Sequence, residues 1–270
     1  MLVGGTGEPV MLLHGGGADS ALVSWGATAE ALAADFRVYL PDWPGYGQSE
    51  PWDRTLRSED LPAIVEQIRQ TLEIDRLTLV GISMGGLASI AYALGYPDNV
   101  DRIVVFGSGG VQDWAPYHFI AWPLLHLPWL GRWMAQWQWK CLARYPALLR
   151  RSLRSLLPTH ETVPEALVDL IAAELRNRED HTVFFRWQRD EVRLRGLRAN
   201  FTSRLAELRA PTLVVHGTRD IAAPVRYARR AARLIPNARY EEIEGGGHWL
   251  PREFPERSGQ LVREFLRQQP

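Results

Sequence analysis

Cysteine is almost absent from this chain of 270 residues, and lysine is equally rare. Cys141 is the only cysteine, so no internal disulfide can form and a reducing compartment such as the cytoplasm is the expected location. Lys140 is the only lysine, and nearly all of the positive charge is therefore arginine. The formal net charge is zero, which gives no sign of a nucleic-acid partner or of a membrane held by charge.

The chain also lacks an uninterrupted apolar run of about 18 residues, so no transmembrane helix and no stable membrane insertion are predicted. The longest apolar segment, residues 119–142, is interrupted by prolines, a glycine and basic residues. The first residues show no basic segment followed by a long apolar one, so no secretory signal is predicted. A hydrophobic content of 46% is nevertheless ordinary for a globular protein with a sizeable core.

Short apolar runs alternate with helical patterns at both ends of the chain. Strands are predicted at residues 10–13, 37–40, 77–80, 102–106, 212–216 and 238–243. Helices are predicted at residues 25–34, 58–72, 87–94, 225–234 and 256–266. This alternation predicts an α/β fold with a mostly parallel central sheet flanked by helices.

The middle of the chain has a different pattern. No strand is predicted from about residue 111 to residue 200, and helices are predicted at residues 164–176 and 181–193. We therefore expect a core made of residues 1–110 and 201–270, with residues 111–200 inserted as a helical cap.

The predicted strand 77–80 runs directly into Gly81-Ile82-Ser83-Met84-Gly85 and then into a helical pattern. A Cβ atom at Gly81 or Gly85 would collide with the neighbouring strand or helix, which explains both glycines. The Ser83 hydroxyl would stand at the N-terminus of a helix, where the helix dipole favours negative charge. The same five residues can also form a close-packed turn with a capping serine, but the strand and helix around them favour a nucleophile.

A serine nucleophile needs a base and an orienting acid. His248 follows the last predicted strand in a glycine-rich loop, and Asp220 follows the strand before it. The order Ser83, Asp220, His248 predicts a catalytic triad at the carboxyl ends of the strands. His14 also borders a glycine loop, but it leaves a buried strand directly, and we expect a structural role for it.

The oxyanion of such a reaction needs hydrogen-bond donors. The backbone N–H groups of Gly16 and Met84 are the expected pair, with Gly17 as the substitute for the first. Gly15, Gly17 and Trp249 border these groups and are expected to contact the substrate. No metal ligand set is predicted.

Five motifs in this order resemble the α/β-hydrolase superfamily. They are His14-Gly15-Gly16-Gly17, Asp42-Trp43-Pro44-Gly45-Tyr46-Gly47-Gln48-Ser49, Gly81-Ile82-Ser83-Met84-Gly85-Gly86, His216-Gly217-Thr218-Arg219-Asp220 and Gly247-His248. The resemblance implies an α/β-hydrolase fold and hydrolysis through an acyl-serine or related intermediate, with no metal or organic cofactor. Members with an aspartate nucleophile are disfavoured, because Ser83 occupies that position.

Within the superfamily the chain is similar to two groups of capped enzymes. One is the esterases, and the other cleaves carbon–carbon bonds in aromatic ring-fission (meta-cleavage) products. The second group usually has asparagine before the nucleophile, where this chain has Ile82, and uses a cap arginine to hold a carboxylate. Arg186 and Arg189 are the candidates for that arginine.

The main hypothesis is therefore a carboxylesterase for fairly apolar acyl or aromatic esters, and the carbon–carbon hydrolase is the alternative. A ligand-binding receptor on a hydrolase scaffold is a third reading, although its usual sign, an eroded triad, is absent here. The expected partner is a small-molecule ester, and a homodimer stays open.

Tryptophan is concentrated in the cap. The cap's tryptophans are Trp114, Trp122, Trp129, Trp133, Trp137, Trp139 and Trp187. We expect them chiefly to pack the core of the cap. Two other roles stay open: an apolar wall over Ser83, and docking on a lipid surface, which tryptophan with arginine and Lys140 at its edges permits.

Overall fold

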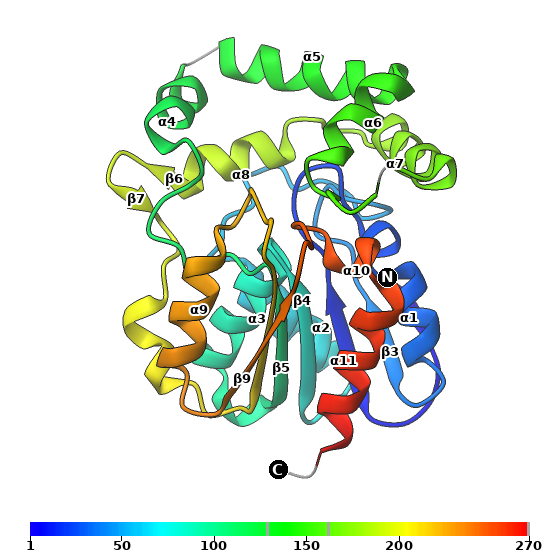
Figure 1. Ribbon diagram of the computed structural model, residues 1–270, viewed down its shortest axis with the longest axis vertical. Helices are drawn as coiled ribbons and strands as arrows, with labels where there is room; N and C mark the ends of the chain where they lie inside the picture. Colours follow the sequence, from blue (N-terminus) through cyan, green and yellow to red (C-terminus); the bar gives the residue numbers. More distant parts are fainter. Residues whose placement is uncertain (128–129, 161–162, 269–270) are drawn as a thin grey trace.

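The computed structural model describes residues 1–127, 130–160 and 163–268, and it confirms the predicted α/β arrangement (Figure 1). In this part of the chain, seven strands form one sheet in the order β1-β3-β2-β4-β5-β8-β9. The strands are β1 (Leu2–Gly4), β2 (Pro9–Leu13), β3 (Arg37–Leu40), β4 (Leu77–Ile82), β5 (Val100–Phe106), β8 (Thr212–Gly217) and β9 (Ala238–Ile243). Only the edge strand β1 pairs antiparallel, so the sheet is mostly parallel as predicted.

Helices cover both faces of the sheet. Helices α1 (Ala21–Leu32) and α11 (Pro255–Arg267) pack on one face, and α2 (Leu61–Thr71), α3 (Met84–Gly95) and α9 (Val225–Leu234) pack on the other. Alternate residues of β2 enter the two cores, with Val10 and Leu12 on one side and Met11 and Leu13 on the other. Burial on both faces explains why the central strands are continuously apolar in sequence.

Shorter elements join the main ones. They are the 3₁₀ helices η1 (Pro97–Asn99) and η2 (Thr202–Glu207) and the single-turn helix α10 (Leu250–Glu253). The predicted helix at residues 58–72 begins later than expected, at Leu61, after Asp60 in the cap position.

Helices α4 to α8, which we call the cap, lie at one end of the sheet (Figure 1). They are α4 (His118–His126), α5 (Leu130–Arg144), α6 (Pro146–Arg154), α7 (Glu165–Asn177) and α8 (Val183–Glu191). The helix expected at residues 181–193 ends at Glu191, and a small hairpin of β6 (Val192–Arg193) and β7 (Gly196–Leu197) follows. The prediction of no strand between residues 111 and 200 was wrong there, because strands of two residues are too short to show the alternation of apolar and polar residues. The cap boundaries at residues 111 and 200 stay a prediction.

None of the helices in the described ranges combines the length and the apolar character that crossing a membrane requires.

Candidate active site

The predicted nucleophile stands in a sharp turn between β4 and α3. Ser83 has φ 53° and ψ −112°, a conformation that residues with a side chain rarely adopt and that often marks functional sites. A Cβ atom on Gly81 would lie 2.3 Å from the Gly85 carbonyl oxygen. One on Gly85 would lie 2.1 Å from the Leu13 carbonyl oxygen. The steric reason predicted for the two glycines is therefore confirmed.

Asp220 and His248 are brought together by neighbouring strands. Asp220 follows β8 and His248 follows β9, and these two strands pair in the sheet. His248 Nδ1 and Asp220 Oδ2 are hydrogen-bonded at 2.8 Å. The other carboxylate oxygen, Oδ1, accepts the N–H groups of Ala222 and Ala223, each at 2.8 Å. With its proton on Nδ1, His248 has Nε2 as its basic nitrogen, which is the arrangement a general base requires.

The charges of this pair support each other. Burial acts to lower the pKa of His248, but the Asp220 carboxylate outweighs it and raises that pKa above 6.5. Burial acts to raise the pKa of Asp220, but His248 and His216 outweigh it and lower that pKa below 3.8. Asp220 therefore remains ionised at neutral pH and stabilises an imidazolium on His248.

Ser83 and His248 both line a cavity of about 530 Å³ between the sheet and the cap. Within the described ranges, no hydrogen bond involves the Ser83 hydroxyl, and Nε2 of His248 has none either. Both groups are thus available to a bound molecule, and hydrogen bonds of this kind often tighten only when substrate is present.

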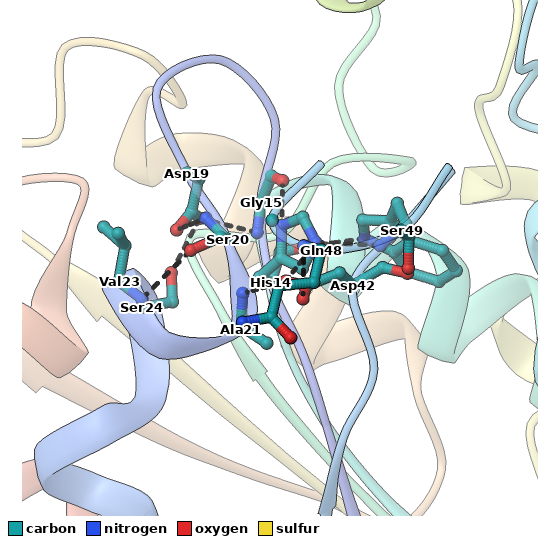
Figure 2. A network of polar contacts seen from close by, with 12 residues as sticks. His14, Gly15, Asp19, Ser20, Ala21, Val23, Ser24, Asp42, Gln48 and Ser49 are labelled. Atoms are coloured by element: carbon teal, nitrogen blue, oxygen red, sulfur yellow. Dashed lines mark hydrogen bonds and ion pairs between the residues drawn. The ribbon is translucent and has the colours of Figure 1, made fainter. Parts of the chain in front are cut away.

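The glycine-rich loop after β2 is held by a network around Asp19 (Figure 2). Asp19 Oδ2 accepts the Gly15 N–H at 2.8 Å and the Ser24 hydroxyl at 2.6 Å. Oδ1 accepts the Ser20 N–H at 2.8 Å. Trp249, which lines the cavity, donates its indole N–H to Ser24 Oγ at 2.8 Å. The network therefore joins the loop after β2 to the loop that carries His248.

This network decides which amides can face an oxyanion. The Gly15 N–H is occupied by Asp19, whereas the Gly16 and Met84 N–H groups have no acceptor in the parts of the chain that the structure describes. Both residues line the cavity with Ser83. Gly16 and Met84 therefore have the free donors that the predicted oxyanion hole requires.

His14 has the structural role expected of it. Its Nδ1 hydrogen-bonds the Gly15 carbonyl at 2.7 Å, and its Nε2 accepts the Trp43 N–H at 3.0 Å. Burial lowers the pKa of His14 to about 4, so the ring is neutral at pH 7 and ties two loops together.

Asp19 was not predicted as a site residue. It lines the cavity, and burial raises its pKa to about 7 despite three hydrogen bonds to its oxygens. A lone aspartate in a loop reads as a turn former, so the sequence carries no signal that separates it from the many others.

Arg178, at the end of α7, was also missed. Its Nη1 donates to the Gly17 carbonyl at 2.6 Å, and its Nη2 donates to the Asp19 carbonyl at 2.9 Å. The guanidinium lies over the Tyr46 ring, 4.6 Å from the centroid. A buried arginine from the cap thus fixes the outer side of the glycine loop.

The two arginines chosen from the sequence do not reach the cavity. Arg186 pairs with Asp180 at 2.6 Å, and Arg189 is exposed to solvent. The structure therefore gives no support to a substrate contact by either arginine, since Phe184, Trp187 and Gln188 are the residues of α8 that line the cavity together with Glu191.

The described part of the cavity wall is mostly apolar and contains no fixed positive charge. Trp139 and Trp187 line it as the predicted apolar wall, and the Phe184 ring covers Gly16 so closely that a Cβ there would lie 2.3 Å away. Among the described residues that line it, there is no arginine and no lysine, and the carboxylates are Asp19 and Glu191.

The tryptophans divide between several environments. Trp133 and Trp137 are 58% and 60% exposed, so the prediction that they pack the cap core was wrong. Trp114 is 40% exposed, Trp122 stacks on His126, and Trp129 lies outside the described residues.

The described ranges contain no group of three or more His, Cys, Asp or Glu side chains that could hold a metal ion, and the absence of a metal stays a prediction.

Comparisons with known proteins identify the family. A family model described as alpha/beta hydrolase fold matches residues 8–255. A 2-hydroxy-6-oxononadienedioate/2-hydroxy-6-oxononatrienedioate hydrolase from Burkholderia vietnamiensis is 32% identical over 275 residues, covering 97% of this chain and 88% of the relative.

Solved structures of two kinds resemble the chain closely. A meta-cleavage product hydrolase from Pseudomonas fluorescens has a TM-score of 0.80 at 27% identity, covering 98% of this chain and 92% of the other. A thermophilic esterase from Thermogutta terrifontis has a TM-score of 0.77 at 25% identity, with the same coverage. The names of the relatives favour the carbon–carbon hydrolase, which the sequence put second, over the ester hydrolase, which it put first.

Proposed function

This chain belongs to the α/β-hydrolase family, and from that premise we propose that it cleaves a carbon–carbon bond next to a ketone in an aromatic ring-fission product. The observation that carries the proposal is the 32% identity, over nearly the whole chain, to a hydrolase named for such a substrate. The paired Asp220 and His248 beside the cavity that Ser83 also lines are consistent with it.

We assign the roles as follows. Ser83 attacks the ketone carbon, His248 takes the serine proton, and Asp220 holds the imidazole and stabilises its charge. The amides of Gly16 and Met84 hold the oxyanion of the tetrahedral intermediate. The intermediate expels a carbon leaving group, which is stabilised by its conjugated chain and takes the proton from His248. Water then releases the acyl group from Ser83.

A carboxylesterase is the second candidate, and the cavity wall favours it. The relatives' names describe dioates and dienoates, which carry carboxylates, yet no arginine or lysine lines this cavity in the described residues. A neutral ester needs no such cation, and Trp139 and Trp187 suit an apolar acyl or aromatic part. In both readings the partner is a small molecule, and the cytoplasmic location stays a proposal.

One experiment separates the readings. The purified protein is assayed in parallel on a coloured ring-fission dienoate and on p-nitrophenyl esters of graded acyl length, with Ser83→Ala as the control. We expect dienoate turnover that Ser83→Ala abolishes. Ester turnover with an inert dienoate would select the esterase instead. A fluorophosphonate probe that fails to label Ser83 would contradict both and favour a receptor.

A further inference from the structure

The outer side of the cap exposes a large apolar surface. The outer cap face consists of Tyr117, Phe119, Ile120, Leu124, Leu127, Trp133, Met134 and Trp137, with Arg132, Lys140 and Arg144 at its margin. The eight apolar and aromatic members are between 41% and 81% exposed. They come from α4 with its flanking residues and from α5, which pack against each other at the end of the molecule opposite the C-terminus (Figure 1). Large exposed apolar side chains gathered on two neighbouring helices are a sign of an interaction site.

The spacing on α5 groups these residues on one side of the helix. Trp133, Trp137, Lys140 and Arg144 recur at intervals of four, three and four residues, which is the repeat of a single helical face. The rings of Trp133 and Trp137 stack, with centroids 6.4 Å apart and planes at 13°. One face of α5 thus presents two adjacent indoles followed by two cations.

The segment that carries this face has charged side chains of one sign only. Residues 114–160 contain six basic residues and no aspartate or glutamate. Only one of the six, Arg150, forms an ion pair in the described part of the chain, with Glu165 of α7. Because the whole chain has a net charge of zero, the remainder carries a matching excess of six acids. The segment that carries the outer cap face is therefore basic, although the chain as a whole is neutral.

The apolar and basic side chains of the outer cap face together indicate what it binds. A second copy seated on the same face in a two-fold dimer would oppose one cationic, acid-free segment to another, which is repulsive. An anionic lipid surface accepts both features, because indoles and aliphatic side chains enter the interface while basic residues meet the headgroups.

We propose that the outer cap face docks on an anionic phospholipid surface. The same two helices form the roof of the cavity, since Ala121 and Leu125 of α4 and Trp139 of α5 line it from inside. Docking would therefore place the roof of the cavity, rather than the sheet, against the lipid. This proposal concerns where the protein sits and is independent of which bond it cleaves.

Vesicle flotation tests the proposal. The protein is mixed with vesicles of phosphatidylcholine alone or with an equal part of phosphatidylglycerol. We expect binding to the anionic vesicles only, and a loss of binding as salt rises from about 50 mM to about 500 mM, because salt screens the attraction. Trp133→Ser with Trp137→Ser, and Lys140→Gln with Arg144→Gln, should each weaken binding about tenfold.

Matched controls keep the test specific. Leu234→Ser on α9 and Arg257→Gln on α11 change exposed residues of the same kinds away from the cap and should leave binding unchanged. Brominated acyl chains should quench tryptophan fluorescence of the unmodified protein on anionic vesicles, so the test does not depend on variants alone. Equal affinity for neutral and anionic vesicles, or none for either, overturns the proposal. So does a dimer in light scattering that the double tryptophan variant dissociates, which would make the occupant a second copy.

Discussion

The end of the sheet lines the cavity from one side, and α4 and α5, whose outward side is the outer cap face, line it from the other, but the two regions are built in opposite ways. At the end of the sheet, the carboxylates of Asp220 and Asp19 accept several hydrogen bonds. The chain segments there also lie so close together that Gly85 has no room for a Cβ atom. On the outer cap face, apolar side chains lie in water, and Lys140 and Arg144 form no ion pair within the described ranges. Within the described ranges, the groups without a partner in the first region are those that face the cavity, such as the Ser83 hydroxyl and the Gly16 N–H, whereas the second region exposes apolar and charged side chains to solvent.

The two regions are suited to different tasks. Stabilising an oxyanion requires donors that are already in place, so the site is set on rigid strand ends and pinned loops. Binding a partner requires exposed apolar or charged side chains that have few contacts within the protein, and such side chains are found on the helices of the cap. The predictions below test this division, beginning with the largest effect.

Ser83→Ala should lower turnover about 10⁴-fold or more, since the nucleophile acts as a unit with its base and acid. The double variant Trp133→Ser, Trp137→Ser should change turnover of a soluble substrate less than about twofold. Both are measured as kcat/KM. An equal loss in the two would show that the outer cap face takes part in the chemistry, and the division would fail.

Gly85→Ala should destabilise the protein by about 3 kcal/mol or more, because its Cβ would lie 2.1 Å from the backbone oxygen of Leu13. Gly95→Ala, in the same helix, is the control. Nothing lies within 4 Å of its Cβ, and alanine should stabilise by about 0.5 kcal/mol. Urea denaturation measures both. A mild effect at Gly85 would mean that the turn is less rigid than its contacts indicate.

Arg178→Met should lower kcat about 10- to 100-fold, because the carbonyls of Gly17 and Asp19 lose their donor and the glycine loop shifts. Arg189→Gln, which changes an exposed arginine of α8, should have little effect. Steady-state kinetics on one substrate compare the two. Partial rescue by Arg178→Lys would separate positioning from simple loss of fold, while unchanged kcat in Arg178→Met would refute the role.

The pH profile should show the smallest change. Since protonated His248 cannot accept the serine proton, kcat/KM should fall as the pH drops through a pKa above 6.5. Asp220→Asn removes the charge that raises this pKa, so the midpoint of the residual activity should move to lower pH. Lys140→Gln with Arg144→Gln should leave the midpoint in place. A midpoint that follows the cap cations would contradict the assignment of His248.

The same pair also shapes stability. The raised pKa of His248 contributes stability that is present below pH 6.5 and is lost as the pH rises through the raised value. The lowered pKa of Asp220 contributes stability that is present above pH 3.8 and is lost as the pH falls through the lowered value. The pair therefore contributes most to the stability of the fold between pH 3.8 and pH 6.5.

The sequence predicted the parts of the site that depend on local geometry. Ser83 needs glycines on either side, and Asp220 and His248 follow strands, so each has a signal within a few residues. The mostly parallel sheet followed from the alternation of apolar runs and helical patterns.

The cap was harder to predict for a physical reason. Arg178 contacts Gly17 across 161 residues, and no local pattern records a contact between segments so far apart. Trp133 and Trp137 read as core because tryptophan is usually buried, whereas their exposure depends on how α5 is turned about its axis. The lack of acids in residues 114–160 was visible in the sequence and was the available sign that this surface differs.

The hydrogen bonds from Trp249 through Ser24 and Asp19 to the Gly15 amide connect the loop after β9 with the loop after β2. His248, next to Trp249 in the chain, and Gly16, next to Gly15, are therefore anchored through one shared linkage. Removing the Ser24 hydroxyl would break that linkage. Proton transfer and oxyanion binding would then both be weakened, although Ser24 itself need touch no substrate.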